Sequence, residues 1–479
     1  MKKKIELEKK VRVRMAPSPT GPMHIGGGRT ALFNYLFAKK NNGSFILRIE
    51  DTDKERSDQK WTQEIIEEFK WLGIEWNEGP DVGGEFGPYK QSQRLEIYKE
   101  YLEKLLTEKK AYYCDCSAEE LEAKRQDQQS RGLAPKYDGK CRGLNKTQGV
   151  IRFHIESKKV KFHDLIRGEV EFDSGLLGDI VIAKDLDSPL YHFAVVVDDF
   201  LMDISHVIRG EEHLANTPRQ ILLQEALHFS QPTYAHLPLM LNTDRSKMSK
   251  RVGDVAISDY HKNGYLPEAI VNFIALLGWN PGTEKDIFTL AELVKEFSIE
   301  KVQKSSAVFN LQKLDYLNGY YIREKSIGNL VKLCMPYLSE FDITQYNPKQ
   351  LEKIVEAYKA RIKKLSEITD LVDFFFVEKL SYEKGLLVWK EMRDSETKKS
   401  LQHSAIILSD AKDWDKENLE TLLVKEATAF NPKNKGDLLW PLRIALSGKE
   451  ASASPFEIAE ILGQEKSLKR INDAIESLN

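Results

Sequence analysis

The sequence predicts an α/β protein in which a parallel sheet is interrupted by an α+β insertion and followed by all-α domains. A strand, a loop, a helix and a second strand follow one another within residues 11–49, which is how parallel sheets begin. A similar strand and helix return at residues 206–221 after an irregular stretch, and helical periodicity takes over from about His261. A chain of 479 residues also exceeds what one hydrophobic core usually organises, so several domains are expected.

The first strand is predicted at residues 11–14, where valine alternates with arginine. After a loop rich in Pro and Gly, residues 29–37 have helical spacing, and residues 45–49 form a second apolar strand. Ligands of parallel sheets bind beyond the carboxyl ends of the strands. We therefore expect His24 and Glu50 to lie at a binding site.

The regular pattern is lost between Cys114 and about Lys184, although residues 149–155 resemble a strand. We interpret this stretch as an insertion between two halves of one sheet, which resumes at residues 206–209. The next helix is predicted to begin with a capping residue, a proline at the first helical position and a capping-box partner, which are Thr217, Pro218 and Gln220.

Helices are predicted for the last third of the chain, where no series of hairpins is found. Gly448 and Gly463 each follow an apolar run and are predicted to stop helices. One apolar helix face is predicted from the spacing of Leu351, Ile354, Val355, Tyr358, Ile362 and Leu365.

The composition, 41% hydrophobic and 30% charged, is that of an ordinary globular protein. No apolar stretch approaches the roughly 18 residues that a membrane span needs, and residues 1–10 lack the apolar core of a secretory signal. We expect a cytoplasmic protein without a membrane partner. The net charge of -3 gives no basic footprint, so any nucleic-acid contact must use local basic patches.

Two motifs stand far apart in the chain: PSPTGPMHIGG at residues 17–27 and DRSKMSKR at residues 244–251. Together they resemble the two signatures of class I aminoacyl-tRNA synthetases. RMAPS at residues 14–18 and RIEDTD at residues 48–53 resemble the glutamyl and glutaminyl branch. With the helical last third, the chain resembles the bacterial-type glutamyl family along nearly its whole length.

This resemblance implies a split, Rossmann-like nucleotide-binding domain and a set of further domains. Residues 1–113 would be the first half of the catalytic domain, 114–204 an insertion that binds the tRNA acceptor stem, and 205–260 the second half. A helical stem-contact domain would follow at 261–335, and an all-α anticodon-binding domain at 336–479. The implied activity is ATP-dependent ligation of L-glutamate to tRNA(Glu) through glutamyl-adenylate, with ATP bringing Mg²⁺. We expect a monomer.

Amino-acid activation needs positioned reactants and donors for phosphate charge, and no covalent nucleophile. His24 before a glycine-rich helix start fits a phosphate donor, and Lys247 and Lys250 fit a loop that closes over pyrophosphate. Each motif alone has a simpler interpretation: the first could be an ordinary loop histidine and the second a solvated basic loop. Only the presence of both motifs in one chain is specific for this family. The ATP-binding residues implied by the resemblance are Gly21, His24, Gly26, Gly27, Met248 and Lys250.

A glutamate side chain is a carboxylate, which is best held by a guanidinium fork. Arg14 and Arg209 each end a predicted strand near the site, although a surface arginine is the alternative for either alone. The resemblance implies that these two arginines hold the side-chain carboxylate and that Glu50 meets the α-amino group. The other pocket residues that it implies are Ala16, Ser18 and Tyr191.

Three cysteines, Cys114, Cys116 and Cys141, resemble the zinc site in the insertion of many bacterial glutamyl enzymes. Those enzymes end the pattern with His where this chain has Gly143, and structural zinc needs four ligands. Two alternatives stay open: three reduced thiols without metal, or Zn²⁺ with a substitute ligand. The candidates for that ligand are Asp115, Tyr137 and His163.

Two rival functions remain at this stage. A glutaminyl-tRNA synthetase shares the chemistry, but two arginines facing a carboxylate and a helical last third argue against it. A non-catalytic tRNA-binding relative would not need His24, Lys247 and Lys250. Whether tRNA(Gln) is charged as well is open; the resemblance places Arg361 where an arginine checks the third anticodon base, which favours discrimination.

Overall fold

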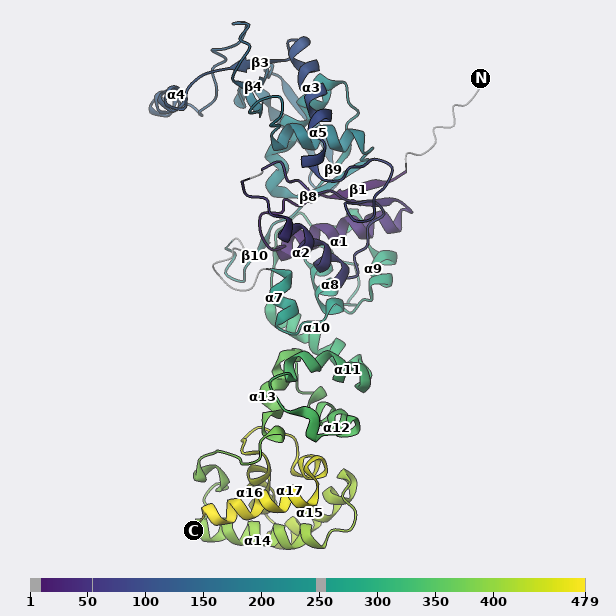
Figure 1. Cartoon of the computed structure of the whole chain (residues 1–479), viewed down its shortest axis with the longest axis vertical. Coiled ribbons are helices and arrows are strands. Elements are labelled where there is room, and N and C mark those ends of the chain that lie inside the picture. The colour runs from purple at the N-terminus through teal and green to yellow at the C-terminus, as the bar shows by residue number, and fades with distance from the viewer. Residues whose placement is uncertain (1–9, 54, 247–255, 479) are drawn as a thin grey trace, which may run out of the picture. The chain divides into compact units, whose positions relative to one another are not determined.

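Parallel strands β1 and β2 begin the sheet that the sequence predicts, as the computed structural model shows (Figure 1). The structure describes residues 10–53, 55–246 and 256–478. The described chain forms two units: residues up to 261 with 267–314, and residues 262–266 with those from 315 onward. The strands, all in the first unit, are β1 (Arg12–Met15), β2 (Ser44–Leu47), β3 (Ala111–Cys114), β4 (Val150–Phe153), β5 (Lys159–Asp164), β6 (Gly168–Asp173), β7 (Ile180–Ala183), β8 (His206–Gly210), β9 (Thr233–Leu237), β10 (Met240–Leu241) and β11 (Ala307–Val308).

The four-stranded sheet of the first unit has the order β6-β5-β9-β8, and the separate pair β1-β2 lies beside it, with β1 next to β8. The backbone N–H of Ser205 donates to the carbonyl of Arg12 at 2.9 Å, and Ser205 Oγ accepts from the N–H of Arg12 at 2.8 Å. Strands β8 and β9 are parallel, and β5 joins β9 at Asp164. The carboxyl ends of β1 and β8 therefore lie at the same edge, as the sequence predicts.

Helices cover this sheet because their apolar faces pack on it. Leu32, Phe33 and Leu36 of α1 are fully buried, and α1 packs on β1, β2 and β8 and on two later helices. The helices of the first unit are α1 (Ile25–Lys40), α2 (Gln59–Trp71), α3 (Leu95–Thr107), α4 (Ala118–Ser130), α5 (Tyr191–Leu201), α6 (Thr217–Leu227), α7 (Ile257–Lys262), α8 (Pro267–Leu276) and α9 (Leu290–Glu296), and α10 (Leu311–Glu324) crosses into the second.

The segment predicted as an insertion holds a small antiparallel sheet, β3-β4-β7, and α4. Its β5–β6 hairpin does not stay separate, because β5 pairs with β9 and extends the sheet that contains β8. The strand expected at residues 149–155 is confirmed as β4. The predicted domain boundaries at 113, 204, 260 and 335 stay predictions.

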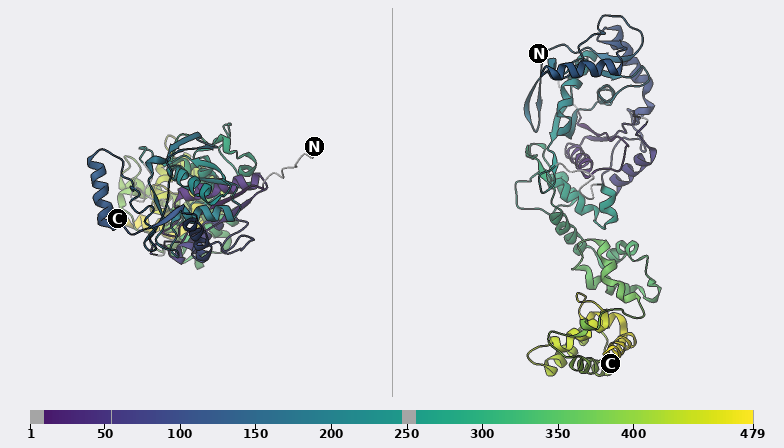
Figure 2. Two further views of the ribbon diagram at one scale, coloured as in Figure 1. Left: turned by 90° about the horizontal axis from the view of Figure 1, so that it is seen from above. Right: turned by 90° about the vertical axis from the view of Figure 1, so that its left-hand side faces the viewer.

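The second unit is helical throughout its described residues, as Figure 2 shows for the green and yellow part of the chain. Buried Leu401, Leu442 and Ile458 come from three helices that pack together, α14, α16 and α17. The helices are α11 (Ile327–Cys334), α12 (Pro348–Lys359), α13 (Ile368–Val372), α14 (Asp394–Asp410), α15 (Lys416–Phe430), α16 (Gly436–Ser447) and α17 (Pro455–Ser477). Short 3-10 helices lie at Gln91–Gln93, Ser174–Leu176, Glu211–Asn216, Ile299–Lys301, Met335–Leu338, Ile343–Gln345, Leu365–Glu367, Asp373–Phe376 and Lys384–Leu387.

The predicted capping box of α6 is wrong. The N-cap is Asn216, which makes no side-chain cap bond, and Pro218 stands at the second helical position, one residue later than predicted. Thr217 Oγ1 instead accepts a hydrogen bond from Arg209 Nη2 at 2.8 Å. The hydroxyl that the sequence assigned to the helix start is thus used to hold the arginine of the neighbouring strand.

Two predictions about the later helices also need correction. Helix α12 ends at Lys359, so Ile362 and Leu365 are buried beyond it and do not continue its face. Gly448 caps α16 in the left-handed region, as predicted. Gly463 breaks the helical geometry of α17, but a helix continues after it.

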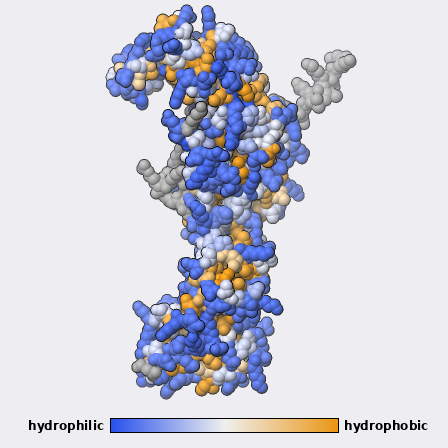
Figure 3. All heavy atoms as spheres, viewed as in Figure 1, coloured by the Kyte–Doolittle hydropathy of each residue, from blue (hydrophilic) through white to orange (hydrophobic). Residues whose placement is uncertain are grey.

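No helix among the described residues is both long and apolar enough to cross a membrane. Figure 3 shows hydrophilic residues over most of the visible face of the molecule.

Candidate active site

A cavity of about 260 Å³ lies at the carboxyl ends of β1 and β8. All six residues predicted to bind glutamate line it, which are Arg14, Ala16, Ser18, Glu50, Tyr191 and Arg209. Backbone bonds hold the two loops together: the N–H of Glu50 donates to the carbonyl of Pro17 at 3.0 Å. The structure thus brings together residues that the sequence placed on separate strands, loops and helices.

Arg14 is held by a carboxylate of the same unit. Its Nε and Nη2 donate to Asp199 Oδ1 and Oδ2 at 3.0 and 3.2 Å, a bidentate pair. The fully buried Arg48 donates to Asp199 at 2.8 Å and to Glu50 Oε1 at 3.0 Å. Arg94 closes the network with a 2.7 Å bond from its Nε to Asp198.

These contacts give the cluster a balanced charge. Burial raises the pKa of Glu50, opposed by the guanidinium groups of Arg48 and Arg14. For Asp199 burial acts in the same direction, but the same two arginines outweigh it and lower the pKa. Three arginines thus face three carboxylates, so the cluster positions Arg14 and Glu50 without a large net charge.

Arg209 has different partners. Its Nε donates to His236 Nε2 at 3.1 Å and its Nη2 to Thr217 Oγ1 at 2.8 Å, and both partners are uncharged groups in these roles. Its Nη1 is buried and has no hydrogen-bond partner among the described residues. Burial lowers the pKa of Arg209 from its usual value. A buried guanidinium with a spare donor is a site for an anionic ligand.

A second cavity, of about 750 Å³, adjoins the first and shares four residues with it. The shared residues are Ser18, Glu50, Tyr191 and His213. Burial raises the pKa of Tyr191 and lowers that of His213 to about 4, so both side chains are uncharged near neutral pH. The small cavity fits an amino acid, and the adjoining space fits a larger group joined to it.

His24 caps the first helix. Its Nδ1 accepts from the backbone N–H of Gly26 at 2.9 Å, so a neutral ring carries its proton on Nε2, where it is a donor. A side chain at Gly27 would collide with Met23 Sδ, and one at Gly28 with Ile257 Cδ1. The glycines therefore permit close packing at the positive end of α1, where anions bind.

The remaining predicted phosphate-binding residues are only partly placed. Gly26 and Gly27 line the small cavity, whereas Gly21, in the loop before α1, lines neither cavity. Lys247, Met248 and Lys250 lie outside the described residues.

Several residues of the site were missed from the sequence, among them His213, Asp199 and His236. His213 lies three residues beyond the end of strand β8, so the rule that ligands bind at the carboxyl ends of parallel strands could have found it. Asp199 stands with Asp198 at the end of an apolar run in α5, and a buried acid pair in such a run signals charged partners. No local pattern singles out His236, which lies inside an ordinary strand.

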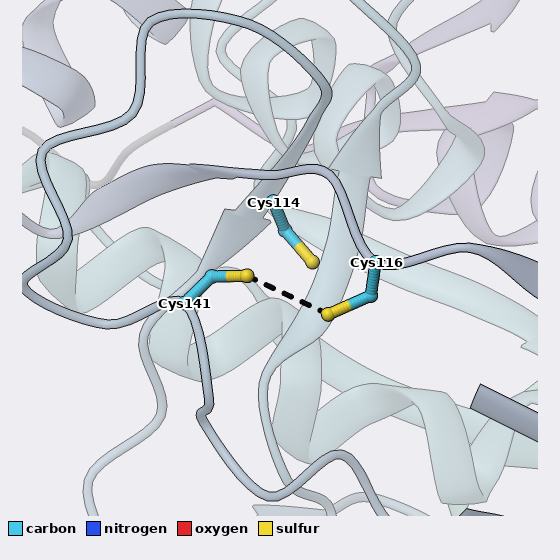
Figure 4. Close-up of side chains that lie close together, drawn as sticks. All are labelled: Cys114, Cys116 and Cys141. Atoms are coloured by element: carbon cyan, nitrogen blue, oxygen red, sulfur yellow. Dashed lines mark hydrogen bonds between the residues drawn. The ribbon is translucent and has the colours of Figure 1, made fainter. Parts of the chain in front are cut away.

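The three cysteines of the insertion lie together (Figure 4). Their sulfur atoms are within 4.8 Å of one another, and Cys116 Sγ is 3.5 Å from Cys141 Sγ. Of the substitute ligands, Tyr137 is best placed: its hydroxyl is 3.3 Å from Cys114 Sγ and 3.5 Å from Cys116 Sγ. Such spacings fit the edges of a tetrahedral zinc site.

The other two candidates fit less well. His163 is exposed on β5, where its Nδ1 contacts Glu169 at 2.6 Å. Asp115 pairs with Lys146 and lies 3.8 Å from Cys141 Sγ. Gly143 has a backbone φ of 71°, which favours glycine over a side chain such as histidine.

Arg361 of the second unit follows α12 and is exposed. Its Nη1 donates to the carbonyl of Ser452, and its guanidinium lies 5.7 Å from the ring centre of Tyr358. Burial, followed by the charge of Arg361, lowers the pKa of Arg443. Arg361 and Arg443 therefore lie near enough to each other for their charges to interact.

The chain is similar to known proteins over nearly its whole length. Residues 10–316 match the family model described as tRNA synthetases class I (E and Q), catalytic domain, and residues 329–475 match the model of an anticodon binding domain. A glutamate–tRNA ligase of Carboxydothermus hydrogenoformans is 44% identical over 96% of this chain and 99% of its own. Glutamate–tRNA ligase 1 of Caldicellulosiruptor saccharolyticus is 46% identical over 96% of this chain and 98% of its own.

The chain is also similar to a solved structure. The crystal structure of a glutamate tRNA ligase from Elizabethkingia meningosepticum, in complex with its amino acid, superposes with a TM-score of 0.87 at 34% identity and covers 98% of this chain and 100% of that one. With these relatives and the matching catalytic model, the chain belongs to the glutamate–tRNA ligase family of class I tRNA synthetases.

Proposed function

We propose that this chain ligates L-glutamate to tRNA(Glu) in two steps that consume ATP. The α-carboxylate of glutamate attacks the α-phosphorus of ATP and pyrophosphate leaves; the terminal ribose hydroxyl of the tRNA then attacks the carbonyl carbon and AMP leaves. ATP enters with Mg²⁺ on its phosphates. Pyrophosphate and AMP are thus the products besides glutamyl-tRNA.

The observation that carries the proposal is the small cavity with Arg209 in its wall. A glutamate side-chain carboxylate can accept from the spare Nη1 donor of Arg209, while Arg14 adds positive charge nearby. Glu50 lines the same cavity and can accept from the α-amino group. The relatives named glutamate–tRNA ligase support the same substrate.

Phosphate binding is assigned to the helix start that follows β1. His24 can donate from Nε2. The N–H groups of Gly26, Gly27 and Gly28 are already bonded to His24, so the start of α1 contributes the positive end of its dipole and not these donors. Lys247 and Lys250 are assigned to the pyrophosphate and Met248 to the adenosine, on the sequence motif alone. Donors of this kind lower the barrier as charge moves onto the phosphates.

The larger cavity is assigned to the tRNA end, since it adjoins the amino-acid cavity and is wide enough for a nucleotide. Residues 114–204 would hold the acceptor stem, 261–335 the stem below it and 336–479 the anticodon, with Arg361 at its third base. Activation of glutamate is proposed to depend on bound tRNA.

We also propose that Cys114, Cys116 and Cys141 hold one Zn²⁺ with the hydroxyl oxygen of Tyr137 as fourth ligand. Zinc would tie β3 to the loop that carries Cys141 and so stabilise the fold of the insertion.

The deciding experiment compares four aminoacylation reactions, of tRNA(Glu) and tRNA(Gln) each with glutamate and glutamine, at the same ATP concentration. We expect glutamate with tRNA(Glu) to be the efficient pair. Glutamine as the preferred amino acid would indicate the glutaminyl rival. If glutamate-dependent exchange of pyrophosphate into ATP is absent even with tRNA present, the chain is a non-catalytic relative.

A further inference from the structure

The arginine of the small cavity stands in front of a buried imidazole and carboxylate. Arg209 on β8 and His236 on β9 are directly paired across the parallel strands. His236 is fully buried, and its Nε2 accepts from Arg209 Nε at 3.1 Å. On the far side, His236 Nδ1 lies 2.6 Å from Oδ2 of the fully buried Asp164.

The hydrogen bonds that join Arg209, His236 and Asp164 fix one tautomer of the imidazole. A guanidinium N–H can only donate, so Nε2 of His236 must be without a proton. The ring proton then sits on Nδ1 and is donated to Asp164 Oδ2. The other oxygen, Asp164 Oδ1, accepts from the backbone N–H groups of Ile166 and Arg167 at 2.9 and 2.8 Å. Asp164 therefore cannot turn without breaking several bonds at once.

Thr217 is the second residue that holds the guanidinium of Arg209. Its Oγ1 accepts from Arg209 Nη2 and lies 3.1 Å from the unprotonated Nε2 of His236, so its own proton has two acceptors: that nitrogen and the carbonyl of His213 at 3.2 Å. With Nε and Nη2 committed to neutral partners, Nη1 is the guanidinium nitrogen without one among the described residues. The direction of the spare donor is thus set by residues that do not line the small cavity.

We infer that Asp164, His236 and Thr217 are positioning residues that aim Arg209 at the side-chain carboxylate of the amino-acid substrate and so determine the KM for glutamate. The inference rests on the proposed function, because it takes Arg209 as the residue that binds that carboxylate. It also assigns the insertion a part in amino-acid selection, since Asp164 ends strand β5.

Two variants of His236 separate positioning from simple packing. In His236→Gln the side-chain oxygen can take the place of Nε2 and accept from Arg209, whereas in His236→Asn the amide replaces Nδ1 and can only reach Asp164. We expect His236→Asn to raise the KM for glutamate by about 10- to 100-fold, the effect of losing one hydrogen bond to a charged group. His236→Gln should stay within about threefold of the parent. The KM for ATP and the kcat at saturating glutamate should change little in both.

Asp164→Asn tests the positioning of Arg209 independently of the His236 variants. An amide that donates to the imidazole would force the ring proton onto Nε2, where it opposes the N–H of Arg209. We expect the same rise in the KM for glutamate. His163→Asn, one residue away on the exposed side of β5, is the matched control and should match the parent. If the His236 variants do not fold, Thr217→Val against Thr217→Ser makes the same comparison.

All variants are assayed as full-length protein by tRNA(Glu) aminoacylation, together with Arg209→Ala. An unchanged KM for glutamate in Arg209→Ala would overturn the pocket assignment itself. If Arg209→Ala raises that KM but His236→Asn and Asp164→Asn do not, the positioning inference alone is overturned. Equal losses in His236→Gln and His236→Asn, or parallel rises in the KM for ATP, would show a packing role and overturn it as well.

Discussion

Arg14 and Arg209 were given the same role from the sequence, but their surroundings differ. Arg14 already faces the carboxylate of Asp199, whereas Arg209 has only uncharged hydrogen-bond partners and a spare Nη1. The strand-end position of each arginine is visible in the sequence because strands alternate and end at loops. Asp199 in α5 and His236 in β9 lie far along the chain from Arg14 and 27 residues from Arg209, respectively, and no local pattern reveals them as partners; Thr217, the other partner of Arg209, is eight residues away.

The difference between the two arginines predicts how the protein responds to its substrate. Glutamate that binds only the folded state should stabilise it and so raise the melting temperature. At a glutamate concentration of a hundred times the Kd, the expected stabilisation is about 2.7 kcal/mol. In Arg209→Met this shift should be lost while the shift caused by ATP remains, as thermal unfolding with each ligand would show. Arg125→Met, at an exposed arginine of α4, is the control. A full glutamate shift in Arg209→Met would place the carboxylate elsewhere.

Tyr137 offers a second test at the residue scale. Its hydroxyl contacts Cys114 and Cys116, so Tyr137→Phe should weaken zinc retention by about tenfold or more in competition with a chelator. The parent should contain close to one zinc per chain by metal analysis, and Cys116→Ser should contain little. Asp115→Asn is the matched control. Zinc-free parent protein with full activity would make the thiols a degenerate site.

At the scale of the elements, one buried carboxylate connects helix α2 to helix α7. Glu68 of α2 is buried, and its Oε1 accepts from the backbone N–H of Ser258 in α7 at 3.0 Å. Nearby, the N–H of Ile257 donates to the carbonyl of Met23, next to His24. Helix α7, which follows residues 247–255, is therefore hydrogen-bonded to the loop that carries His24.

Glu68 also predicts a pH dependence. Burial, with the charge of Glu64, raises the pKa of Glu68 from 4.5 to about 7. Between those values the folded protein holds a proton that the unfolded chain has released, so stability falls as the pH rises through this window. Glu68→Gln should flatten the fall, as melting temperatures across that range would show. Glu67→Gln, at the exposed neighbouring residue, should keep the slope of the parent; an equal slope in all three would exclude Glu68 as the cause.

At the scale of the whole molecule, chemistry and anticodon reading belong to different units. The cavities lie in the first unit, and Arg361 lies in the second, within the residues that match an anticodon binding domain. Each unit has its own buried core, so a change at Arg361 should alter the choice of tRNA without altering the amino-acid pocket.

Arg361→Gln tests that separation. If its guanidinium reads one anticodon base, its loss should narrow the preference for tRNA(Glu) over tRNA(Gln) by about tenfold, from a contact of roughly 1–3 kcal/mol. The KM for glutamate should not change. Lys353→Gln, which removes a positive charge from α12, is the control and should leave the preference for tRNA(Glu) over tRNA(Gln) unchanged. Aminoacylation of both tRNAs by each variant gives the ratio, and an unchanged ratio would remove Arg361 from anticodon discrimination.

The sequence was sufficient for the order of elements and for six residues of one cavity, because strand ends and turn residues leave local signals. It was insufficient where side chains choose partners over long distances. Thr217 looked like a helix cap until Arg209 required its hydroxyl, and the end of α12 before Ile362 was hidden because buried residues continue past it. Tyr137 could not be chosen over Asp115 or His163 because spacing does not show which loop returns to the cysteines.

On the ribosome, the strands of the glutamate pocket emerge far apart in time. Arg12 and Ser205, which join β1 to the start of β8, are 193 positions apart in the chain. At bacterial and eukaryotic synthesis rates this separation corresponds to on the order of 10 to 40 seconds of translation. During that interval β1 has β2 on one side but lacks β8 on the other, and this unpaired edge is open to wrong partners or chaperones. With the roles proposed for Arg209 and His236, a nascent chain that ends before His236 lacks the residue that orients Arg209, so we expect the pocket to be completed only once β9 has left the exit tunnel.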